Sequence, residues 1–374
     1  MELKIDRSNW KKVKLGDVAC EYSKRINNPS KSGFDKFIGS SNIEQWDFKI
    51  RSWDSTDSVT SSMKLFESND YLLVRRSLYA SDFRERAPRA DFSGVCSGDI
   101  LTIKENTDMV VDGFLIGIFN SPSLWKFIVS NASGSITRRI KWKDLANYKF
   151  LLPPKDQQVQ IAKLLWSLDQ VIEKEKEVYN MLKKLLYSTN KFYFKMNNER
   201  IQIKKLVELK KLKKAKAGVS PYVEIGDINL INKKIRIKEK KSVNGSIYAN
   251  KDSTLISKVR PNRGAITFLN NNTIVSGGFV ALVPKADTVL PEYLFHLLAW
   301  NKKFNYQMSR LATGSTYPTI SDEDVLNYKV PFVNINNQKE FLKLTTKQYN
   351  SLCLFEDKIN SSKSLQKSLI NQIF

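Results

Sequence analysis

The chain has 374 residues, with 61 Lys and Arg, 38 Asp and Glu and a formal net charge of +23. Its hydrophobic content of 41% suits folded globular domains, and no run of eighteen apolar residues could span a membrane. Such a basic balance favours a polyanionic partner. The first twelve residues lack the apolar core of a signal peptide, so we expect a cytoplasmic protein without a membrane partner. Its three cysteines lie far apart, which argues against a disulfide framework or a zinc site.

Short apolar runs separated by turn residues fill the first part of the chain, up to about residue 154. They predict a mixed α/β domain of short strands with one helix. We expect the strands at 35–43, 71–79, 98–104 and 112–121, and the helix at 122–133.

Apolar spacing changes after the double proline Pro153–Pro154. Apolar residues now recur alternately three and four positions apart. This spacing predicts one long helix over 155–197 with a coiled-coil seam. The seam is expected to contain Ile161, Leu164, Leu168, Val171, Leu182 and Leu185. A single apolar stripe on so long a helix needs a partner, and the similarly spaced final stretch, 335–374, is the candidate.

The second half of the chain repeats the first. Moving residues 132–149 by 180 positions places them on 312–329 with eight of eighteen identities, whereas chance gives about one. Residues 198–334 therefore form a second copy of the globular domain, and 335–374 a second long helix. The predicted fold is α+β (mixed α/β), with two globular domains in a pseudo-two-fold arrangement separated by a long antiparallel two-helix coiled coil. Domain boundaries are expected at 1–154, 155–197, 198–334 and 335–374.

Catalytic motifs are scarce in this sequence. It has no phosphate-binding G-x-x-x-x-G-K-[ST] loop and no methyltransferase-type Asn/Asp-Pro-Pro-Tyr motif. Asp227, Glu239 and Lys241 could be assembled into a metal-dependent nuclease cluster, but such a pattern arises easily in a chain rich in Lys and Glu. The single histidine, His296, lies in an apolar helical run, which favours core packing over general base catalysis.

This order of parts resembles the specificity subunit (HsdS) of type I restriction-modification systems. The matching residues are Gly134, Ser135, Ile140, Leu145, Pro153, Pro154, Gln157 and Gln158, with the opening Trp10–Ala19 also typical. The second copy departs from the pattern, because Phe332 and Val333 replace the double proline and only Gln338 remains.

The resemblance implies a non-catalytic, prokaryotic DNA-binding subunit without a catalytic or metal site. Each globular domain would be a target-recognition domain for one half of a split, asymmetric site in double-stranded DNA. Two methyltransferase subunits would bind to this chain, with restriction subunits as optional further partners. S-adenosylmethionine, ATP and Mg²⁺ are expected on those partners, with no cofactor bound by this chain.

Basic and polar side chains in loops are the candidates for DNA contacts, because Arg and Lys suit phosphate and guanine while Asn and Gln suit adenine. In the first domain they are Arg75, Arg76, Tyr79, Arg84, Arg86, Arg89, Ser133, Ser135, Arg138 and Arg139. In the second domain they are Lys258, Arg260, Asn262, Arg263, Thr313, Ser315, Thr316 and Tyr317.

Other hypotheses are a specificity subunit for a combined methylase-nuclease of type II (IIB/IIG-like) systems, a divergent metal-dependent nuclease and an RNA-binding scaffold. No paired aromatic platform supports the RNA hypothesis.

Overall fold

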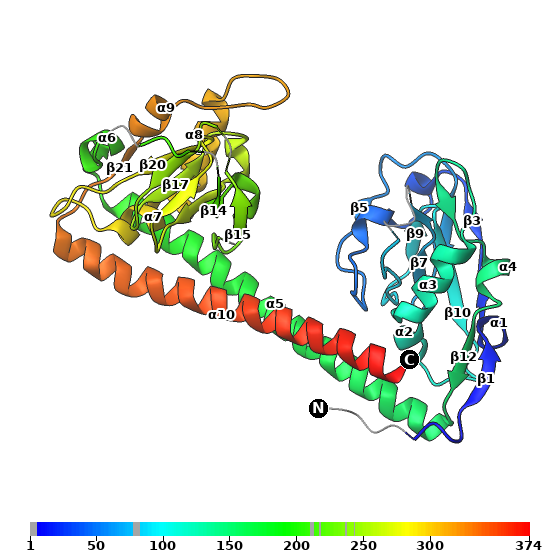
Figure 1. Ribbon diagram of the computed structural model, residues 1–374. Coiled ribbons are helices and arrows are strands. Elements are labelled where there is room, and N and C mark those ends of the chain that lie inside the picture. The colour runs from blue at the N-terminus through cyan, green and yellow to red at the C-terminus, as the bar shows by residue number, and fades with distance from the viewer. Residues whose placement is uncertain (1–5, 78–82, 210–212, 217, 236–237, 243) are drawn as a thin grey trace. The chain divides into compact units, whose positions relative to one another are not determined.

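The computed structural model describes residues 6–77, 83–209, 213–216, 218–235, 238–242 and 244–374. The chain divides into two compact units (Figure 1). Unit 1 is Met1–Lys174 with Ile359–Phe374, and unit 2 is Glu175–Lys358. Each unit therefore contains one globular domain and a part of each long helix.

Unit 1 is built from short strands and short helices. The helices are α1 (Leu15–Val18), α2 (Leu115–Phe119), α3 (Pro122–Asn131) and α4 (Trp142–Leu145), with short 3₁₀ turns η1 (Pro29–Lys31) and η2 (Ser40–Asn42). The strands are β1 (Lys11–Lys14), β2 (Ala19–Glu21), β3 (Arg25–Ile26), β4 (Lys36–Ile38), β5 (Asp54–Ser55), β6 (Met63–Phe66), β7 (Tyr71–Val74), β8 (Arg76–Ser77), β9 (Gly94–Cys96), β10 (Ile100–Glu105), β11 (Arg138–Arg139) and β12 (Lys149–Leu152). They form sheets in the orders β3-β6-β9-β4-β5 and β2-β10-β7, and the pairs β1-β12 and β11-β8.

Unit 2 repeats this order with smaller sheets. Its helices are α6 (Ile203–Leu206), α7 (Pro291–Ala299), α8 (Lys302–Leu311) and α9 (Asp322–Leu326), with 3₁₀ turns η4 (Ile225–Asp227) and η5 (Pro261–Arg263). Its strands are β13 (Arg200–Gln202), β14 (Val219–Val223), β15 (Lys238–Lys241), β16 (Ile247–Ala249), β17 (Thr254–Ser257), β18 (Ile266–Phe268), β19 (Thr273–Val275), β20 (Phe279–Leu282) and β21 (Lys329–Pro331). The sheets are β15-β14-β19-β16, β18-β17-β20 and β13-β21.

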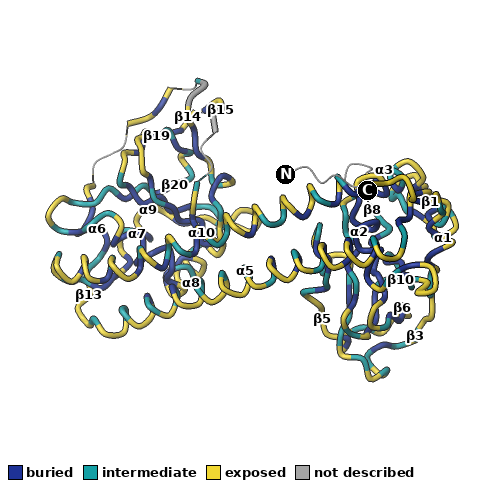
Figure 2. Tube along the Cα trace, turned by 90° about the horizontal axis from the view of Figure 1, so that it is seen from below, coloured by how far each residue is buried: buried dark blue, intermediate teal, exposed yellow. Residues whose placement is uncertain are grey.

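Strand pairing confirms the internal repeat. In unit 1, β4 pairs in parallel with β9, and in unit 2, β14 pairs in parallel with β19. The first strand of each domain likewise pairs antiparallel with the last one, as β1 does with β12 and β13 with β21. The chain thus folds twice into the same framework. Its central strands, such as β7 and β17, are buried, while both long helices carry many exposed residues (Figure 2).

One predicted strand is wrong. Residues 112–121 were expected as a strand, but Leu115–Phe119 form the fully buried helix α2. A short run that is apolar on every side carries no periodicity that separates a buried helix from a buried strand. The equivalent helix in unit 2, α7, begins with Pro291 at its first turn, which is a helix-start signal that the first copy lacks.

The long helices are α5 (Lys155–Met196) and α10 (Ile335–Ile373). They pack together, as expected. In unit 2 the rings of Tyr193 and Phe341 lie 4.2 Å apart, and Gln348 Nε2 donates to Thr189 Oγ1 at 3.2 Å. Later residues of α10 meet earlier residues of α5, so the two helices run antiparallel there. In unit 1, Leu165 of α5 shares a core with Ile370 and Ile373 of α10.

The predicted seam of α5 is partly wrong. Ile161 is buried and Leu168 and Leu182 are half-buried, but Leu164, Val171 and Leu185 are 40%, 48% and 47% exposed. The buried face lies about one residue further along and contains Gln158, Ala162, Leu165, Asp169, Ile172, Leu186 and Asn190. Three of these residues are polar, so the spacing of apolar residues alone indicates the exposed stripe next to the buried face. Among the described residues, no helix has the length and apolar character needed to cross a membrane.

Candidate nucleic-acid interface

Two equivalent loops follow helices α3 and α8. Loop 133–139 is closed by Ser133 and Arg139, whose backbone N–H groups donate to each other's carbonyls at 3.0 and 2.9 Å. Loop 313–319 is closed in the same way by Thr313 and Thr319, at 2.9 Å in both directions. The two loops are 180 residues apart and therefore are the same structural feature in each copy.

Glycine is required at the second position of each loop. Gly134 has φ +134° and Gly314 has φ +101°, values that L side chains rarely adopt. A Cβ on Gly134 would also lie 2.1 Å from the carbonyl oxygen of Thr137. The repeated glycine is therefore explained by the backbone geometry of the closed loop in both domains.

Backbone hydrogen bonds hold the ends of both loops in place, and most loop side chains are exposed to solvent. Ile140 N donates to Arg75 O, and Ile320 N donates to Lys258 O, each at 3.0 Å, which ties both loops to the neighbouring strand segment. The exposed side chains are Ser133, Ser135 and Ile136 in the first loop and Thr313, Ser315, Thr316, Tyr317 and Thr319 in the second. Ile136 is 83% exposed and Tyr317 is 64% exposed.

In unit 1, two of the predicted arginines lie side by side. Arg76 on β8 pairs across the strands with Arg139 on β11. Asp99 accepts from both, with Arg76 Nη1 at 2.8 Å from Oδ2 and Arg139 Nε at 2.9 Å from Oδ1. Burial disfavours the charged carboxylate, but the two arginines outweigh burial and hold the pKa of Asp99 below its ordinary value. Both guanidinium groups remain about two-fifths exposed beside loop 133–139.

The other first-domain arginines differ in their surroundings. Arg138 donates through Nε and Nη2 to Ala132 O, at 3.1 and 2.6 Å, and so fixes the end of α3. Arg86 donates to Ser40 O at 3.1 Å, and Arg84 is exposed. Arg75 contributes its backbone to the loop base, while its Nε is buried and has no hydrogen bond to any described residue. Tyr79 lies outside the described residues.

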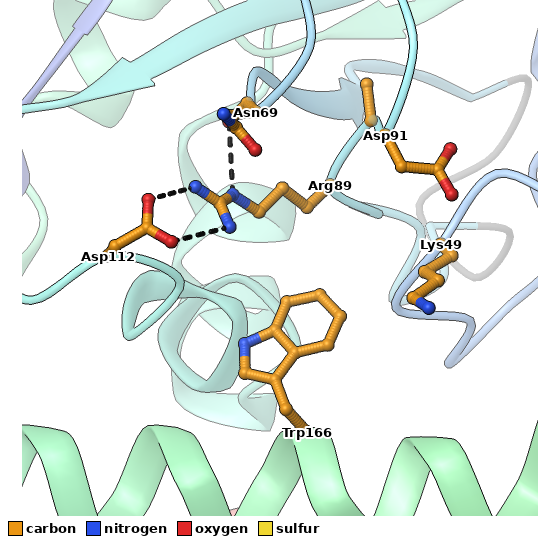
Figure 3. Close-up of a pocket in the computed structure, with 7 residues that line it drawn as sticks. Lys49, Asn69, Arg89, Asp91, Asp112 and Trp166 are labelled. Carbon is orange, nitrogen blue, oxygen red and sulfur yellow. Dashed lines mark hydrogen bonds and ion pairs between the residues drawn. The ribbon is translucent and has the colours of Figure 1, made fainter.

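Arg89 is part of an internal ion cluster. It is 11% exposed and donates to Asp112 through Nη1 at 3.1 Å and also through Nη2, and to Glu105 through Nη2 at 3.3 Å. Figure 3 shows it between Asn69 and Asp112 in a pocket beside Trp166 of α5. Burial raises the pKa of Glu105, although the Gly113 N–H group and Arg89 stabilise its charge. Arg89 therefore lies in an ion cluster of the domain next to α5, with a side chain that is only slightly exposed.

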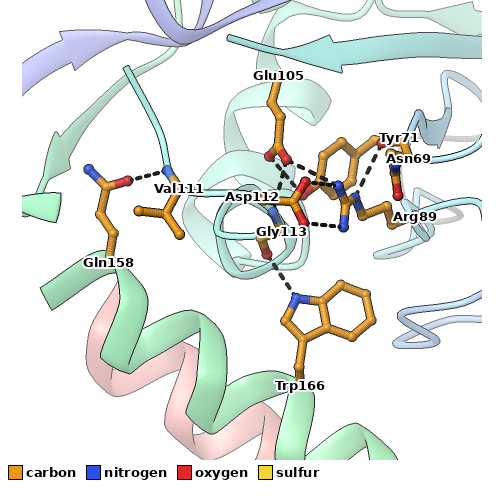
Figure 4. Close-up of polar contacts among 9 residues, drawn as sticks. All are labelled: Asn69, Tyr71, Arg89, Glu105, Val111, Asp112, Gly113, Gln158 and Trp166. Atoms are coloured by element: carbon orange, nitrogen blue, oxygen red, sulfur yellow. Dashed lines mark hydrogen bonds and ion pairs between the residues drawn. The ribbon is translucent and has the colours of Figure 1, made fainter. Parts of the chain in front are cut away.

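The start of each long helix is fixed by one buried glutamine. Gln158 accepts from Val111 N at 2.8 Å and donates to Pro153 O at 2.9 Å, next to the bond from Trp166 Nε1 to Gly113 O (Figure 4). Gln338 accepts from Leu290 N at 2.8 Å and donates to Val333 O and Thr288 O at 3.0 and 3.1 Å. The glutamine shared by the two copies is thus a structural connection, and it needs no double proline before it.

In unit 2, the equivalent surface uses different side chains. The guanidinium of Arg260 lies 4.9 Å from the centre of the Tyr317 ring, and Lys258 Nζ lies 3.1 Å from Asp322 Oδ1. Asn262 and Arg263 are exposed on the turn η5. These predicted residues, with loop 313–319, form one basic and aromatic surface.

Two residues that support these surfaces were not anticipated from the sequence. Asp99 directly precedes strand β10, and an acidic side chain is not an expected component of a DNA-binding surface. Lys233 is buried and donates to Gly264 O at 2.7 Å, which holds the end of η5, and burial lowers its pKa to about 8. It belongs to a run of polar residues that is typical of exposed surface, so the sequence carried no signal for it.

Of the alternative nuclease cluster, the side chain of Glu239 lies outside the described part of the chain. Asp227 is buried and accepts from Glu224 N at 3.0 Å in the turn η4. In unit 1, Asn42 accepts from Gly39 N at 2.7 Å in the equivalent turn η2, so this position closes a turn in both copies. Among the residues that the structure describes, no group of three or more His, Cys, Asp and Glu could hold a metal ion. His296 is buried against Tyr349, which confirms its predicted core position.

Comparison with known proteins gives consistent matches. The sequence matches the family described as the type I restriction modification DNA specificity domain over residues 7–184 and again over 194–361. The type I restriction enzyme HindI specificity subunit of Haemophilus influenzae is 29% identical over 123 residues, covering 32% of this chain and 25% of that protein. The MjaVIII specificity subunit of Methanocaldococcus jannaschii is 25% identical over 287 residues, covering 66% of this chain and 65% of the relative. This chain thus spans less than two thirds of the length of either relative.

Solved structures show the same fold at low identity. The type I restriction-modification S subunit from M. genitalium has a TM-score of 0.62 at 16% identity, covering 100% of this chain and 98% of that one. A chain from a study of complex assembly and conformational transition of the type I R-M system has a TM-score of 0.51 at 16% identity, with 98% and 97% covered. Because the family model matches most of the sequence in two segments, the chain belongs to the type I restriction modification DNA specificity family and carries two copies of the family's domain.

Proposed function

We propose that this chain is the non-catalytic specificity subunit of a type I restriction-modification enzyme and recognises a bipartite, asymmetric target in duplex DNA. One globular domain would bind each half of the target, and the paired helices α5 and α10 would set the spacer between the halves. The observation that carries this proposal is the duplicated loop: 133–139 and 313–319 share one backbone framework but carry different side chains. A shared backbone framework with different exposed side chains suits two related domains that each bind a different DNA sequence.

The partners follow from the family. We infer that two methyltransferase subunits bind this chain and use S-adenosylmethionine to modify adenine N6 in a prokaryotic cytoplasm. Restriction subunits that need ATP and Mg²⁺ would join the same complex. The net charge of +23 supports a DNA partner, because neutralising phosphates releases counterions and drives association.

A type II system with a combined methylase-nuclease is the second candidate, because it would need the same kind of recognition chain. The identity of the catalytic subunit encoded beside this gene separates the two. A nuclease activity of the chain itself is not favoured, because Asp227 is engaged in a turn in unit 2.

Methylation mapping of the source genome, with and without this gene, tests the proposal. We expect one split motif to depend on the gene. Alanine at Ser135 and Arg139 should relax the bases in one half, and alanine at Ser315 and Tyr317 should relax the other. Removing a single base contact should reduce discrimination by about 1–3 kcal/mol. Arg138 is unsuitable for this test, because its replacement would also release the end of α3.

An uninterrupted motif, or equal changes in both halves from either loop, would contradict the proposal. A second assay uses the purified chain alone with duplex DNA and Mg²⁺. Cutting in that assay would show that the chain is itself a nuclease.

A further inference from the structure

Asp99 lies under a pair of exposed arginines on the candidate DNA surface of unit 1. Each of its carboxylate oxygens accepts from a different guanidinium, Oδ2 from Arg76 and Oδ1 from Arg139. The carboxylate is 23% exposed while the arginines are 41% and 42% exposed, so the acid lies beneath and the donors lie above. Arg139 also reaches Thr137 in the loop, with Nη1 at 3.4 Å from Oγ1.

The position of Asp99 is itself fixed by the backbone. It directly precedes β10, its carbonyl accepts from Arg75 N at 3.0 Å, and its N–H donates to Ser97 Oγ at 3.3 Å. The same Arg75 accepts from Ile140, the residue that closes the base of loop 133–139. The backbone of Arg75, between β7 and β8, therefore holds both Asp99 and the base of the loop in position.

Holding two arginines has a physical consequence for recognition. A free arginine loses side-chain entropy when it is ordered, and two adjacent guanidinium groups repel each other. A shared carboxylate orders both before binding and offsets one of the two charges. Each guanidinium has five donors, so most remain available for a base edge or a phosphate.

We propose that Asp99 is a specificity-determining positioning residue that holds Arg76 and Arg139 in place for one half of the target and limits non-specific phosphate binding. Asp99 does not touch the DNA itself. This inference rests on the proposed function, because it assigns how one domain discriminates.

The second copy provides an internal reference. Lys258 N donates to Gly278 O at 2.8 Å, as Arg75 N donates to Asp99 O, so Gly278 occupies the Asp99 position. Val259 pairs with Thr319 where Arg76 pairs with Arg139. Unit 2 therefore lacks both the acid and the two arginines at these positions, and a change at Asp99 should affect one half of the target only.

The test uses the complex with its methyltransferase subunits and the variant Asp99→Asn. Binding is measured on the mapped target, on duplexes changed in one half or the other, and on random duplex, over a range of salt. We expect discrimination in the first half to fall by about tenfold or more, which corresponds to one good base contact. Discrimination in the second half should not change. Affinity for random duplex should be equal or higher, with a steeper salt dependence, because both arginines become free to follow phosphates.

Asp108→Asn is the matched control. It removes the same charge from an exposed turn beyond the other end of β10, and it should leave discrimination in both halves at the wild-type level. Arg139→Lys keeps the positive charge but loses the planar set of guanidinium N–H donors. It should therefore reproduce the Asp99→Asn loss of discrimination while binding to random duplex persists.

The outcomes separate the two levels of inference. If the wild-type complex prefers its target and Asp99→Asn discriminates equally well, only the role of Asp99 is refuted. Equal weakening on every duplex, with a lowered melting temperature, would show a merely structural role and also refute it. If Asp99→Asn does not fold, full first-half discrimination by Arg139→Lys would refute it instead. A wild-type complex without any sequence preference would refute the proposed function.

Discussion

The two units attach the same framework to the long helices with different chemistry. The clearest difference lies at one pair of equivalent helix positions. In unit 1 Lys49 Nζ and Arg51 Nη1 bind Glu173 on α5, at 3.0 and 2.7 Å, and Arg51 Nη2 lies 3.4 Å from Asp169. In unit 2, 180 residues after Asp169, Tyr349 on α10 packs its ring against those of Phe295, His296 and Trp300. The buried glutamine at the helix start, by contrast, is identical in both. The glutamine that satisfies buried backbone groups is thus common to both copies, whereas the side chains at the equivalent positions Asp169 and Tyr349 make different kinds of contact.

The shared glutamines give the largest expected effect. Gln338→Ala would leave Leu290 N, Thr288 O and Val333 O without their partner, and we expect it to lower the free energy of unfolding of unit 2 by about 4 kcal/mol. Gln158→Ala removes two bonds and should cost unit 1 about 3 kcal/mol. Urea unfolding of both variants measures the two costs.

Gln157→Ala serves as the control for the neighbouring position. Gln157 makes one bond, accepting from Trp10 Nε1 at 2.8 Å, so its replacement should cost about 1 kcal/mol. Equal costs for Gln157 and Gln158 would show that the buried amide is not the connection that we infer.

The single histidine should make unit 2 the acid-sensitive unit. Burial of His296 lowers its pKa to about 3 in the fold, while the unfolded chain titrates near 6.5. Below pH 6.5 the unfolded state binds a proton that the folded state rejects, so stability is lost as pH falls. At pH 5 the loss should be about 2 kcal/mol.

Calorimetry of the wild type and His296→Phe between pH 5 and pH 8 measures this effect. The variant keeps an aromatic ring against Tyr349 and should lack the acid-dependent loss. The hypothesis fails if both proteins lose the same stability over this range.

Much of the fold and part of the site could be predicted from the sequence, for reasons that differ from residue to residue. The repeat, the long helices and the Gly-Ser loops follow from local patterns, because periodicity and a positive φ at glycine leave direct traces in the sequence. The predicted seam of α5 failed at Asp169, because its ion-pair partner Arg51 is 118 residues away in the sequence and leaves no local signal that Asp169 is buried. Asp99 was missed for the same reason: Arg139, which gives it a role, is 40 residues away.

Asp169 should give the smallest effect and the opposite pH dependence from His296. Burial raises the pKa of Asp169 to about 6, and the negative charges of Glu173 and Asp47 act in the same direction. The positive charge of Arg51 opposes this shift without cancelling it. Asp169 Oδ2 is buried without a hydrogen bond in the described part of the chain. Between pH 3.8 and pH 6 the folded state holds a proton that the unfolded state has lost, so unit 1 loses stability as pH rises through this window.

Asp169→Asn tests this directly. The neutral amide avoids the cost of burying a charge, and we expect it to stabilise unit 1 by about 1–2 kcal/mol at pH 8, with the advantage disappearing near pH 4. Glu173→Gln is the contrasting change, because its partners Lys49 and Arg51 hold the pKa of Glu173 below its ordinary value despite burial. It should destabilise unit 1 at pH 8. If both amides destabilise equally at pH 8, Asp169 contributes as an ordinary ion pair, and unit 1 has no loss of stability at rising pH to set against the acid response of His296 in unit 2.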